Sequence, residues 1–209
     1  MTLLEPAVTL TDFALAIECG LFAVWLSRSG SARFQAAFVI LFAATAVAAL
    51  LGGISHGFLP GSDIVWRATL IAICVSAFAT WLIGARLTLS EEYQKVITAL
   101  AALAFAAQSA YIMFADASFL IAILGYVPAA LFLLIAFGLA YRRSHAPFLL
   151  AGIGGVALTF LAAAVQQSGI GLHPRYFDHN AFYHLIQGVA LFLLFWTARG
   201  LIKSSSQRG

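Results

Sequence analysis

The chain has 209 residues, of which 63% are hydrophobic and only 9% are charged, and its mean hydropathy is +0.99. Typical soluble domains carry roughly 25% charged residues, so this composition excludes a soluble domain of ordinary kind. The apolar runs are long enough to cross a bilayer, which takes about 20 residues per helix. The sequence therefore predicts an all-α, polytopic membrane protein. In such a chain the net charge of +3 is a topology signal, and no nucleic-acid partner is expected.

Seven apolar segments follow one another along the chain, and polar or turn-forming residues separate them. Together they predict a single seven-helix transmembrane domain over residues 1–209. The predicted spans are 7–26, 34–58, 64–87, 96–114, 117–140, 147–165 and 179–197. The longest loop, 166–178, precedes the last span, and the tail that contains Ser204 to Ser206 is expected to fray.

The distribution of lysine and arginine predicts the orientation of the bundle. If the N-terminus lies outside, nine basic residues fall on the inner side and two on the outer side, which is a clear positive-inside bias. The expected orientation is N-out and C-in. The inner residues are Arg28, Arg33, Arg86, Lys95, Arg142, Arg143, Arg199, Lys203 and Arg208, and the outer ones are Arg67 and Arg175.

The start of the last span carries polar side chains where hydrocarbon is expected. Ionisable groups at membrane depth are costly unless they are paired, so they mark a functional site by default. His184 lies five residues into this span, roughly 7 Å below its start at 1.5 Å per residue. Glu18 in the first span and His56 near the end of the second are expected at a similar depth in the outer half of the bilayer. Each histidine could instead be an interfacial side chain that reaches water.

Helical spacing adds further polar groups to this region. Asn180, His184 and Gln187 have the spacing i, i+4, i+7 and share one face of the last span. Asp63, Asp178 and His179 are expected to form a shallower ring above Glu18, His56 and His184. The supporting polar face consists of Asn180, Gln187, Tyr183 and Asp178, and His179 could equally cap the helix with Asp178. In the second span, the pair Gly52-Gly53 would let a neighbouring helix approach closely.

Two or three histidines with a carboxylate are the usual ligands of an open catalytic zinc site. The sequence therefore favours an intramembrane Zn²⁺ site with His56, His179 and His184 as candidate ligands. A buried Glu18 also needs a cation or a hydrogen-bond donor beside it.

At these residues the chain resembles the CREST superfamily, which contains alkaline ceramidases, progestin/adiponectin-type receptors with bacterial hemolysin-III relatives, and GPI-remodelling proteins. Its members are seven-helix membrane proteins whose metal site uses a histidine at the end of span two and two histidines at the start of span seven. The corresponding residues here are His56, His179 and His184. The resemblance is to a remote, bacterial-type branch, which implies the inner membrane as location.

Several positions depart from the pattern of that superfamily. Gly52 stands where the superfamily has serine, Arg67 where it has aspartate, and Asn180 where it has the first histidine of an HxxxH pair. The acidic N-terminal calcium motif of the ceramidases is absent from the sequence.

The resemblance implies metal-assisted hydrolysis of a lipid amide or ester, with a membrane lipid as the substrate. The metal would activate a bound water and polarise the carbonyl. Asp63 or Glu18 would act as general base, and Ser55 or Tyr183 would stabilise the oxyanion. The protein partners are not indicated by the sequence.

Two other classes of function stay open at this stage. One is a non-enzymatic membrane protein that binds or transports a small molecule or ion, with Glu18 and His184 as a proton-coupled pair. The other is a b-type haem protein in which His56 and His184 are the two axial ligands. A retinal pigment is set aside, because the only lysines, Lys95 and Lys203, are predicted at the inner surface.

Overall fold

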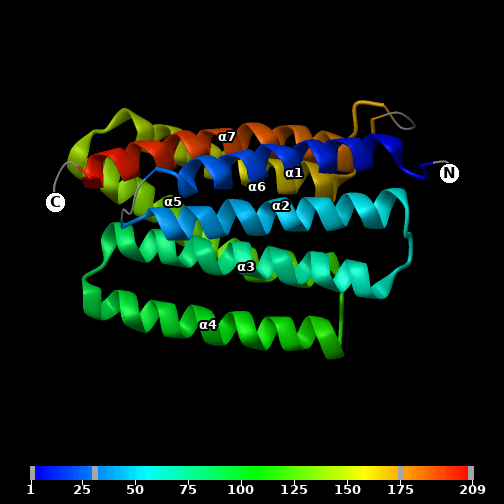
Figure 1. The fold of residues 1–209 in the computed structure, drawn as a ribbon, viewed down its shortest axis with the longest axis horizontal. Helices are drawn as coiled ribbons and strands as arrows, with labels where there is room; N and C mark the ends of the chain where they lie inside the picture. Colours follow the sequence, from blue (N-terminus) through cyan, green and yellow to red (C-terminus); the bar gives the residue numbers. More distant parts are fainter. Residues whose placement is uncertain (1–2, 30–32, 174–176, 207–209) are drawn as a thin grey trace.

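The computed structural model describes residues 3–29, 33–173 and 177–206. Over these residues the chain forms seven α-helices (Figure 1), and each is long and apolar enough to cross a membrane. This confirms the predicted all-α, seven-helix membrane protein. The helices are α1 (Pro6–Ser27), α2 (Gln35–Gly57), α3 (Asp63–Thr88), α4 (Glu91–Phe114), α5 (Phe119–Ser144), α6 (Pro147–Ser168) and α7 (His179–Ser206).

Two helix boundaries differ clearly from the predicted spans. Helix α4 begins at Glu91 rather than at 96, because Glu91 and Glu92 occupy its first turn, where the helix dipole favours acidic side chains. Helix α7 continues to Ser206, so the prediction that the tail frays there was wrong. Leu201 and Ile202 are buried, and this packing holds the last turns of α7 in helical form.

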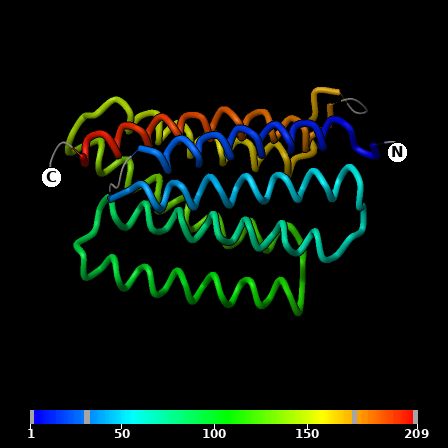
Figure 2. Tube along the Cα trace, in the orientation of Figure 1, coloured from blue at the N-terminus to red at the C-terminus, as the bar shows by residue number. Residues whose placement is uncertain are grey.

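Six of the helices form a closed ring and the seventh lies outside it. Around the ring α1 packs against α2, α2 against α3, α3 against α5, α5 against α6, α6 against α7, and α7 against α1. Helix α4 packs mainly against α3 on the periphery, as both ribbon and tube views show (Figures 1 and 2). The interior of the molecule is therefore enclosed by α1, α2, α3, α5, α6 and α7.

Glycines allow the close approach of neighbouring helices at two of these interfaces. A Cβ atom on Gly53 of α2 would lie 2.7 Å from the ring of Phe13 on α1. A Cβ atom on Gly155 of α6 would lie 2.8 Å from the backbone carbonyl of Ala190 on α7. Small residues at helix interfaces let backbones pack closely in membranes. The close approach predicted at Gly52-Gly53 is confirmed.

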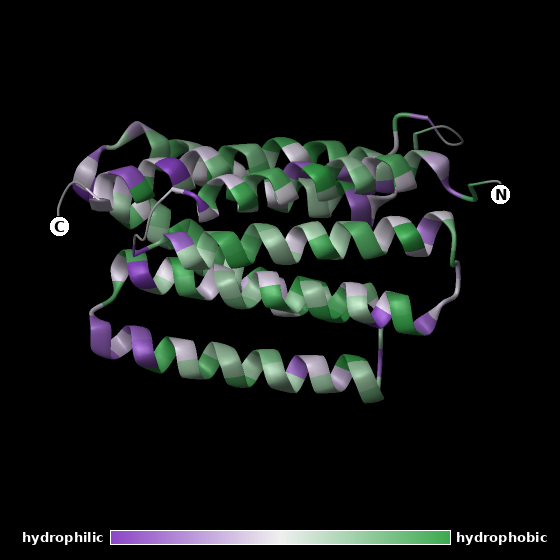
Figure 3. Ribbon diagram, in the orientation of Figure 1, coloured by the Kyte–Doolittle hydropathy of each residue, from purple (hydrophilic) through white to green (hydrophobic). Residues whose placement is uncertain are grey.

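The two ends of the bundle differ in charge. Hydrophilic residues gather toward the helix ends, while hydrophobic residues cover much of the helix lengths (Figure 3). Because α1 begins and α7 ends at opposite ends, we call these the N-end and the C-end of the bundle (Figure 1). Arg67 lies near the N-end, whereas Arg175 and Arg208 lie outside the described residues. The basic residues toward the C-end are Arg28, Arg33, Arg86, Lys95, Arg142, Arg143, Arg199 and Lys203.

Candidate functional site

The six-helix ring encloses a cavity of about 290 Å³, toward the N-end of the bundle. This volume is close to the lower end of the range typical of small-molecule sites. Most of the cavity wall is apolar, with side chains such as Leu15, Ile73, Phe119 and Leu191. The polar residues of the wall are Asp12, Thr45, His56, Thr69, Ser76, Tyr126, Thr159, Gln166, Asn180, Tyr183, His184 and Gln187.

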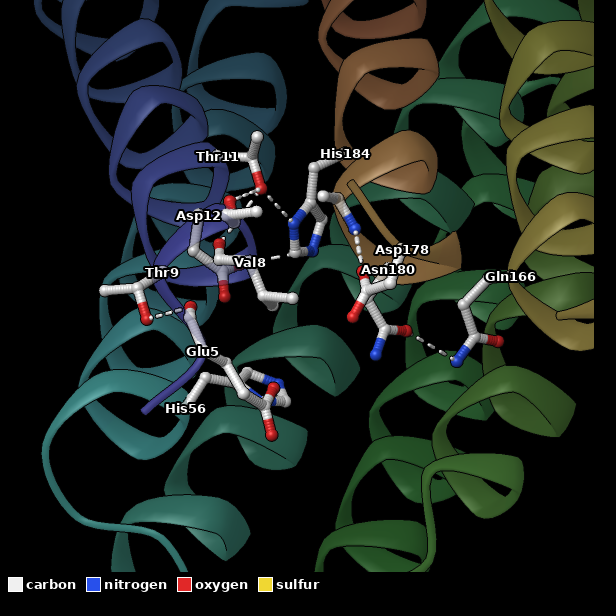
Figure 4. A network of polar contacts seen from close by, with 12 residues as sticks. Glu5, Val8, Thr9, Thr11, Asp12, His56, Gln166, Asp178, Asn180 and His184 are labelled. Carbon is white, nitrogen blue, oxygen red and sulfur yellow. Dashed lines mark hydrogen bonds and ion pairs between the residues drawn. The ribbon is translucent and has the colours of Figure 1, made fainter. Parts of the chain in front are cut away.

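A carboxylate–imidazole pair joins α1 to α7 at this cavity. The Nε2 atom of His184 lies 3.2 Å from Oδ1 of Asp12, and its Nδ1 atom lies 3.0 Å from the hydroxyl of Thr11 (Figure 4). Asp12 is almost completely buried, with 4% of its surface exposed. Its second carboxylate oxygen, Oδ2, has no hydrogen-bond partner among the described residues. The pair thus leaves one buried carboxylate oxygen without a partner on a residue that lines the cavity.

The donors and acceptors around Asp12 and His184 limit where the protons of the two side chains can be. The Thr11 hydroxyl lies 2.9 Å from the carbonyls of Ala7 and Val8, and it has a single proton to donate. If that proton goes to the backbone, Nδ1–H of His184 donates to Thr11, and Nε2 needs a proton from Asp12 or of its own. If Thr11 instead donates to Nδ1, then Nε2–H donates to Oδ1 of Asp12, and Asp12 is either charged or carries a proton on Oδ2. Because a buried charge is costly unless it is paired, the pair requires one shared proton or an external cation.

Glycine at position 52 creates the space that the Asp12 carboxylate occupies. A Cβ atom on Gly52 would lie 3.2 Å and 3.3 Å from the two carboxylate oxygens of Asp12, closer than an ordinary van der Waals contact. Gly52 also lines the cavity. The absence of a side chain at Gly52 therefore leaves room for a carboxylate from α1.

A second acid–imidazole pair lies closer to the N-end. The Nδ1 atom of His56 is 2.8 Å from Oε2 of Glu5, and both side chains are partly exposed to solvent. The His56 ring packs edge-on against Trp66, with 6.3 Å between ring centroids. His56 and Trp66 both line the cavity, so this pair forms part of its rim.

The predicted polar face of the last span points into the cavity. Asn180, His184 and Gln187 all line it, as their spacing predicted. The side-chain carbonyl oxygen of Asn180 accepts a hydrogen bond from the side-chain amide of Gln166 at 3.4 Å (Figure 4). The Gln187 amide donates to Thr159 at 3.4 Å, and its carbonyl oxygen has no partner in the described part of the chain. Gln187 thus adds a second unused acceptor.

Other predicted site residues do not meet at this cavity. Glu18 faces Gly188, whose added Cβ would lie 3.2 Å from the Glu18 carboxylate, and Glu18 is not part of the cavity wall. Asp63 is largely exposed and forms an ion pair with Arg67 at 2.6 Å. Ser55 is buried but likewise lies outside the wall. The assignment of these residues to one site with His56 and His184 is therefore not supported by the arrangement.

Two further predicted residues belong to the start of α7. Asp178 accepts a hydrogen bond from the backbone N–H of Ala181 at 2.9 Å, so it caps the helix. His179 is the first residue of α7 and does not line the cavity. Tyr183, by contrast, does line it.

The predicted zinc ligands are not brought together in this arrangement. In residues 3–29, 33–173 and 177–206, no group of three or more His, Cys, Asp or Glu side chains is placed to hold a metal ion. His184 uses both ring nitrogens for Thr11 and Asp12, and His56 uses Nδ1 for Glu5. As arranged, His56, His179 and His184 do not fit a zinc centre.

Sequence reasoning missed Glu5, Thr11 and Asp12 as site residues. Asp12 is an ionisable residue in an apolar span, so the argument applied to Glu18 applies to it as well. Thr11 and Glu5 could not be found without knowing which face of α1 meets α2 and α7.

The fold and the cavity define a polytopic helical membrane protein with an internal polar site. The chain belongs to a family described as Family of unknown function (DUF6962), whose model matches residues 7–203. No curated protein and no solved structure matches the chain significantly. The likeness to the CREST superfamily remains a hypothesis based on the sequence motifs alone.

Proposed function

We propose that this protein binds a small amphipathic molecule in the cavity of its six-helix ring, as a membrane-embedded binding protein or proton-coupled carrier. The observation that supports this most directly is the buried carboxylate of Asp12. One of its oxygens contacts His184, and the other is buried without a partner in the described chain, although Asp12 itself lines the 290 Å³ cavity. Unpaired buried acceptors cost free energy, so a ligand that donates to them would be stabilised.

The chemistry of the wall indicates the class of ligand. The two unused buried acceptors, on Asp12 and Gln187, favour a ligand with hydrogen-bond donors, and the Asp12 carboxylate favours a cationic donor over a neutral one. The apolar remainder of the wall favours a hydrocarbon portion. We therefore expect a cationic amphipath, such as an alkylammonium, rather than a fatty acid.

A proton on the Asp12–His184 pair would be exchanged for the ligand's charge. An incoming ammonium group can replace the shared proton as the partner of the Asp12 carboxylate. Binding of the cation would then release a proton, which is the coupling a carrier requires. The positive-inside bias would place this cavity toward the outer side of the membrane.

Ligand titration of purified protein in detergent tests the proposal. Octylamine and octanoate share an alkyl chain and differ in the sign of their head group, so they are the two probes. Trp66 lines the cavity, and quenching of its fluorescence reports occupancy, with a Trp66→Phe variant as blank. We expect octylamine to bind and octanoate not to bind.

The Asp12→Asn variant is the decisive comparison, with Glu18→Gln as its matched control. Both variants neutralise an acid on α1, but only Asp12 lines the cavity. A hydrogen bond to a charged group contributes about 1.5–3 kcal/mol, so Asp12→Asn is expected to weaken octylamine binding about tenfold or more. Equal affinities for the two variants would contradict the proposal.

A metal-dependent lipid hydrolase is the second candidate. The sequence favours it, and His56, His184 and Asp12 line the same cavity, but no three such side chains in the described part of the chain are placed to hold a metal ion. A zinc ion would require His184 to release Thr11 or Asp12. Metal analysis of the purified protein tests this candidate: about one zinc per chain, lost in His184→Ala, would favour it over simple binding. Unchanged metal content in the variant would rule out this site.

The haem alternative receives less support from the geometry. An axial histidine needs a free ring nitrogen directed at the iron, whereas both nitrogens of His184 contact residues of α1. Purified protein without a Soret band would dispose of it.

A further inference from the structure

A second hollow lies at the other end of the bundle, between α1, α6 and α7. Its volume is about 550 Å³, and we call it the C-end groove. It is far along the helices from Asp12, and it shares no lining residue with the first cavity. The residues that define it are Trp25, Phe148, Trp196, Arg199, Lys203 and Ser206.

Arg199 is held in this groove by aromatic rings rather than by an acid. Its guanidinium lies 5.3 Å from the Trp25 ring centroid, 5.8 Å from that of Phe195 and 5.9 Å from that of Trp196. These distances are within the range of cation–π contact. Arg199 forms no ion pair with any described residue. Its charge is thus oriented by the rings, and no acid among the described residues compensates it.

Lys203 adds a second positive charge on the same face. It follows Arg199 by four residues on α7, so the two side chains are neighbours along the helix. Lys203 is exposed, and no Asp or Glu is among the residues that line the groove. The hydroxyl of Ser206 also lines the groove, but it donates its proton to the Ile202 carbonyl at 3.1 Å, so the two basic side chains are the donors that face a ligand.

The apolar floor of the groove is fixed by close packing. A Cβ atom on Gly200 would overlap the ring of Phe148, so glycine is what lets this ring sit against α7. The Phe148 carbonyl also accepts a hydrogen bond from Thr197 at 2.8 Å. The floor therefore joins α6 and α7 firmly, and the aromatic wall of Trp25 and Trp196 stands beside the two cations.

We propose that the C-end groove binds the phosphate head group of an anionic membrane phospholipid. Arginine presents a planar fork that suits phosphate oxygens, and tryptophan side chains are favoured at the level of lipid head groups. Basic pockets between transmembrane helices on the inner side of a membrane are suited to such head groups. The acyl chains of the bound lipid would extend from the C-end along Trp196 and the part of α7 that precedes it in sequence.

Titration of delipidated protein with phospholipids, followed by native mass spectrometry, tests this site. The probes are dioleoyl phosphatidylglycerol and dioleoyl phosphatidylcholine, which differ in net charge. We expect the anionic lipid to bind more tightly to the wild type. Because one basic side chain near a lipid surface contributes about 1 kcal/mol, Arg199→Gln should weaken its binding about fivefold.

Arg142→Gln is the matched control, since Arg142 lies at the same end of the bundle on α5 but outside the groove. It should alter phosphatidylglycerol binding by less than twofold. If Arg199→Gln fails to fold, Ser206→Asp places a negative charge in the groove without removing Arg199, and it should weaken binding to a similar extent. Equal binding by Arg142→Gln and Arg199→Gln, or by both lipids, would overturn the proposal. Displacement of the lipid by millimolar inorganic phosphate would also overturn it, in favour of a soluble anion.

Discussion

Replacement of Gly52 by alanine perturbs the Asp12–His184 pair without removing either residue. The new Cβ would lie 3.2 Å from one Asp12 carboxylate oxygen and 3.3 Å from the other. The carboxylate must therefore shift by a few tenths of an ångström. Its contact with Nε2 of His184 is already 3.2 Å, at the long end of the usual hydrogen-bond range. We expect the shift to break this contact.

The expected change in stability is the balance of two effects. Alanine is favoured over glycine inside a helix by about 0.8–1.0 kcal/mol. Loss of a hydrogen bond to a charged group costs about 1.5–3 kcal/mol. Gly52→Ala should therefore be destabilised by roughly 0.5–2 kcal/mol, and each kcal/mol lowers the melting temperature by about 2–4 °C for a chain of this size.

Thermal melting in a single detergent measures the effect, with Gly154→Ala as the control. A Cβ on Gly154 would meet only Leu193, at 3.7 Å, which is an ordinary contact. The control should melt at the wild-type temperature or above it. Gly52→Ala should melt below it and should also bind octylamine more weakly. If both variants show the same melting temperature and the same affinity, the reasoning about the space beside Asp12 is refuted.

The remaining predictions concern the peripheral helix and the orientation of the bundle. A Cβ on Gly125 would overlap the Gln108 amide, which donates to a carbonyl of α5, so Gly125→Ala should increase hydrogen–deuterium exchange in α4. Gly138→Ala is the control, because Gly138 lies on α5 like Gly125 and its added Cβ would meet nothing within 4 Å. Equal exchange of α4 in both variants would contradict the role of the Gln108 contact in holding α4. Single cysteines placed at exposed Ala115 and Ser90 should react with an impermeant thiol reagent only from outside and only from inside, respectively; the reverse pattern would invert the proposed orientation. Both native cysteines are buried and should stay silent.

The helices could be predicted because their signal is local in the sequence. A run of about 20 apolar residues has to form a helix in a bilayer, where each backbone polar group needs a partner within the segment. The helical period then predicted that Asn180, His184 and Gln187 share one face of the last helix, and all three line the cavity. The least accurate boundaries were those of α4 and α7, where acidic first-turn residues and tertiary packing extend the helices beyond their apolar runs.

The partners of the polar residues could not be predicted in the same way. Depth along the membrane normal is set by the number of residues from a helix end, but two side chains at one depth can still face different neighbours. Glu18 and Asp12 illustrate this, because they lie on the same helix and only Asp12 lines the cavity. His56 and His184 share a cavity, yet each has its own carboxylate partner, on Glu5 and Asp12.

The sequence alone determined the class of the protein, the number of helices and the face of the last helix that carries polar groups, since each of these follows from composition and helical period. Only the tertiary structure decided which helices enclose the site and which carboxylate meets His184. Those outcomes depend on the rotation of α1 against α2 and α7, and that rotation is set by close packing at glycines such as Gly52 and Gly53. Because the energy of such packing depends on several helices at once, it is not encoded in the pattern of any single span.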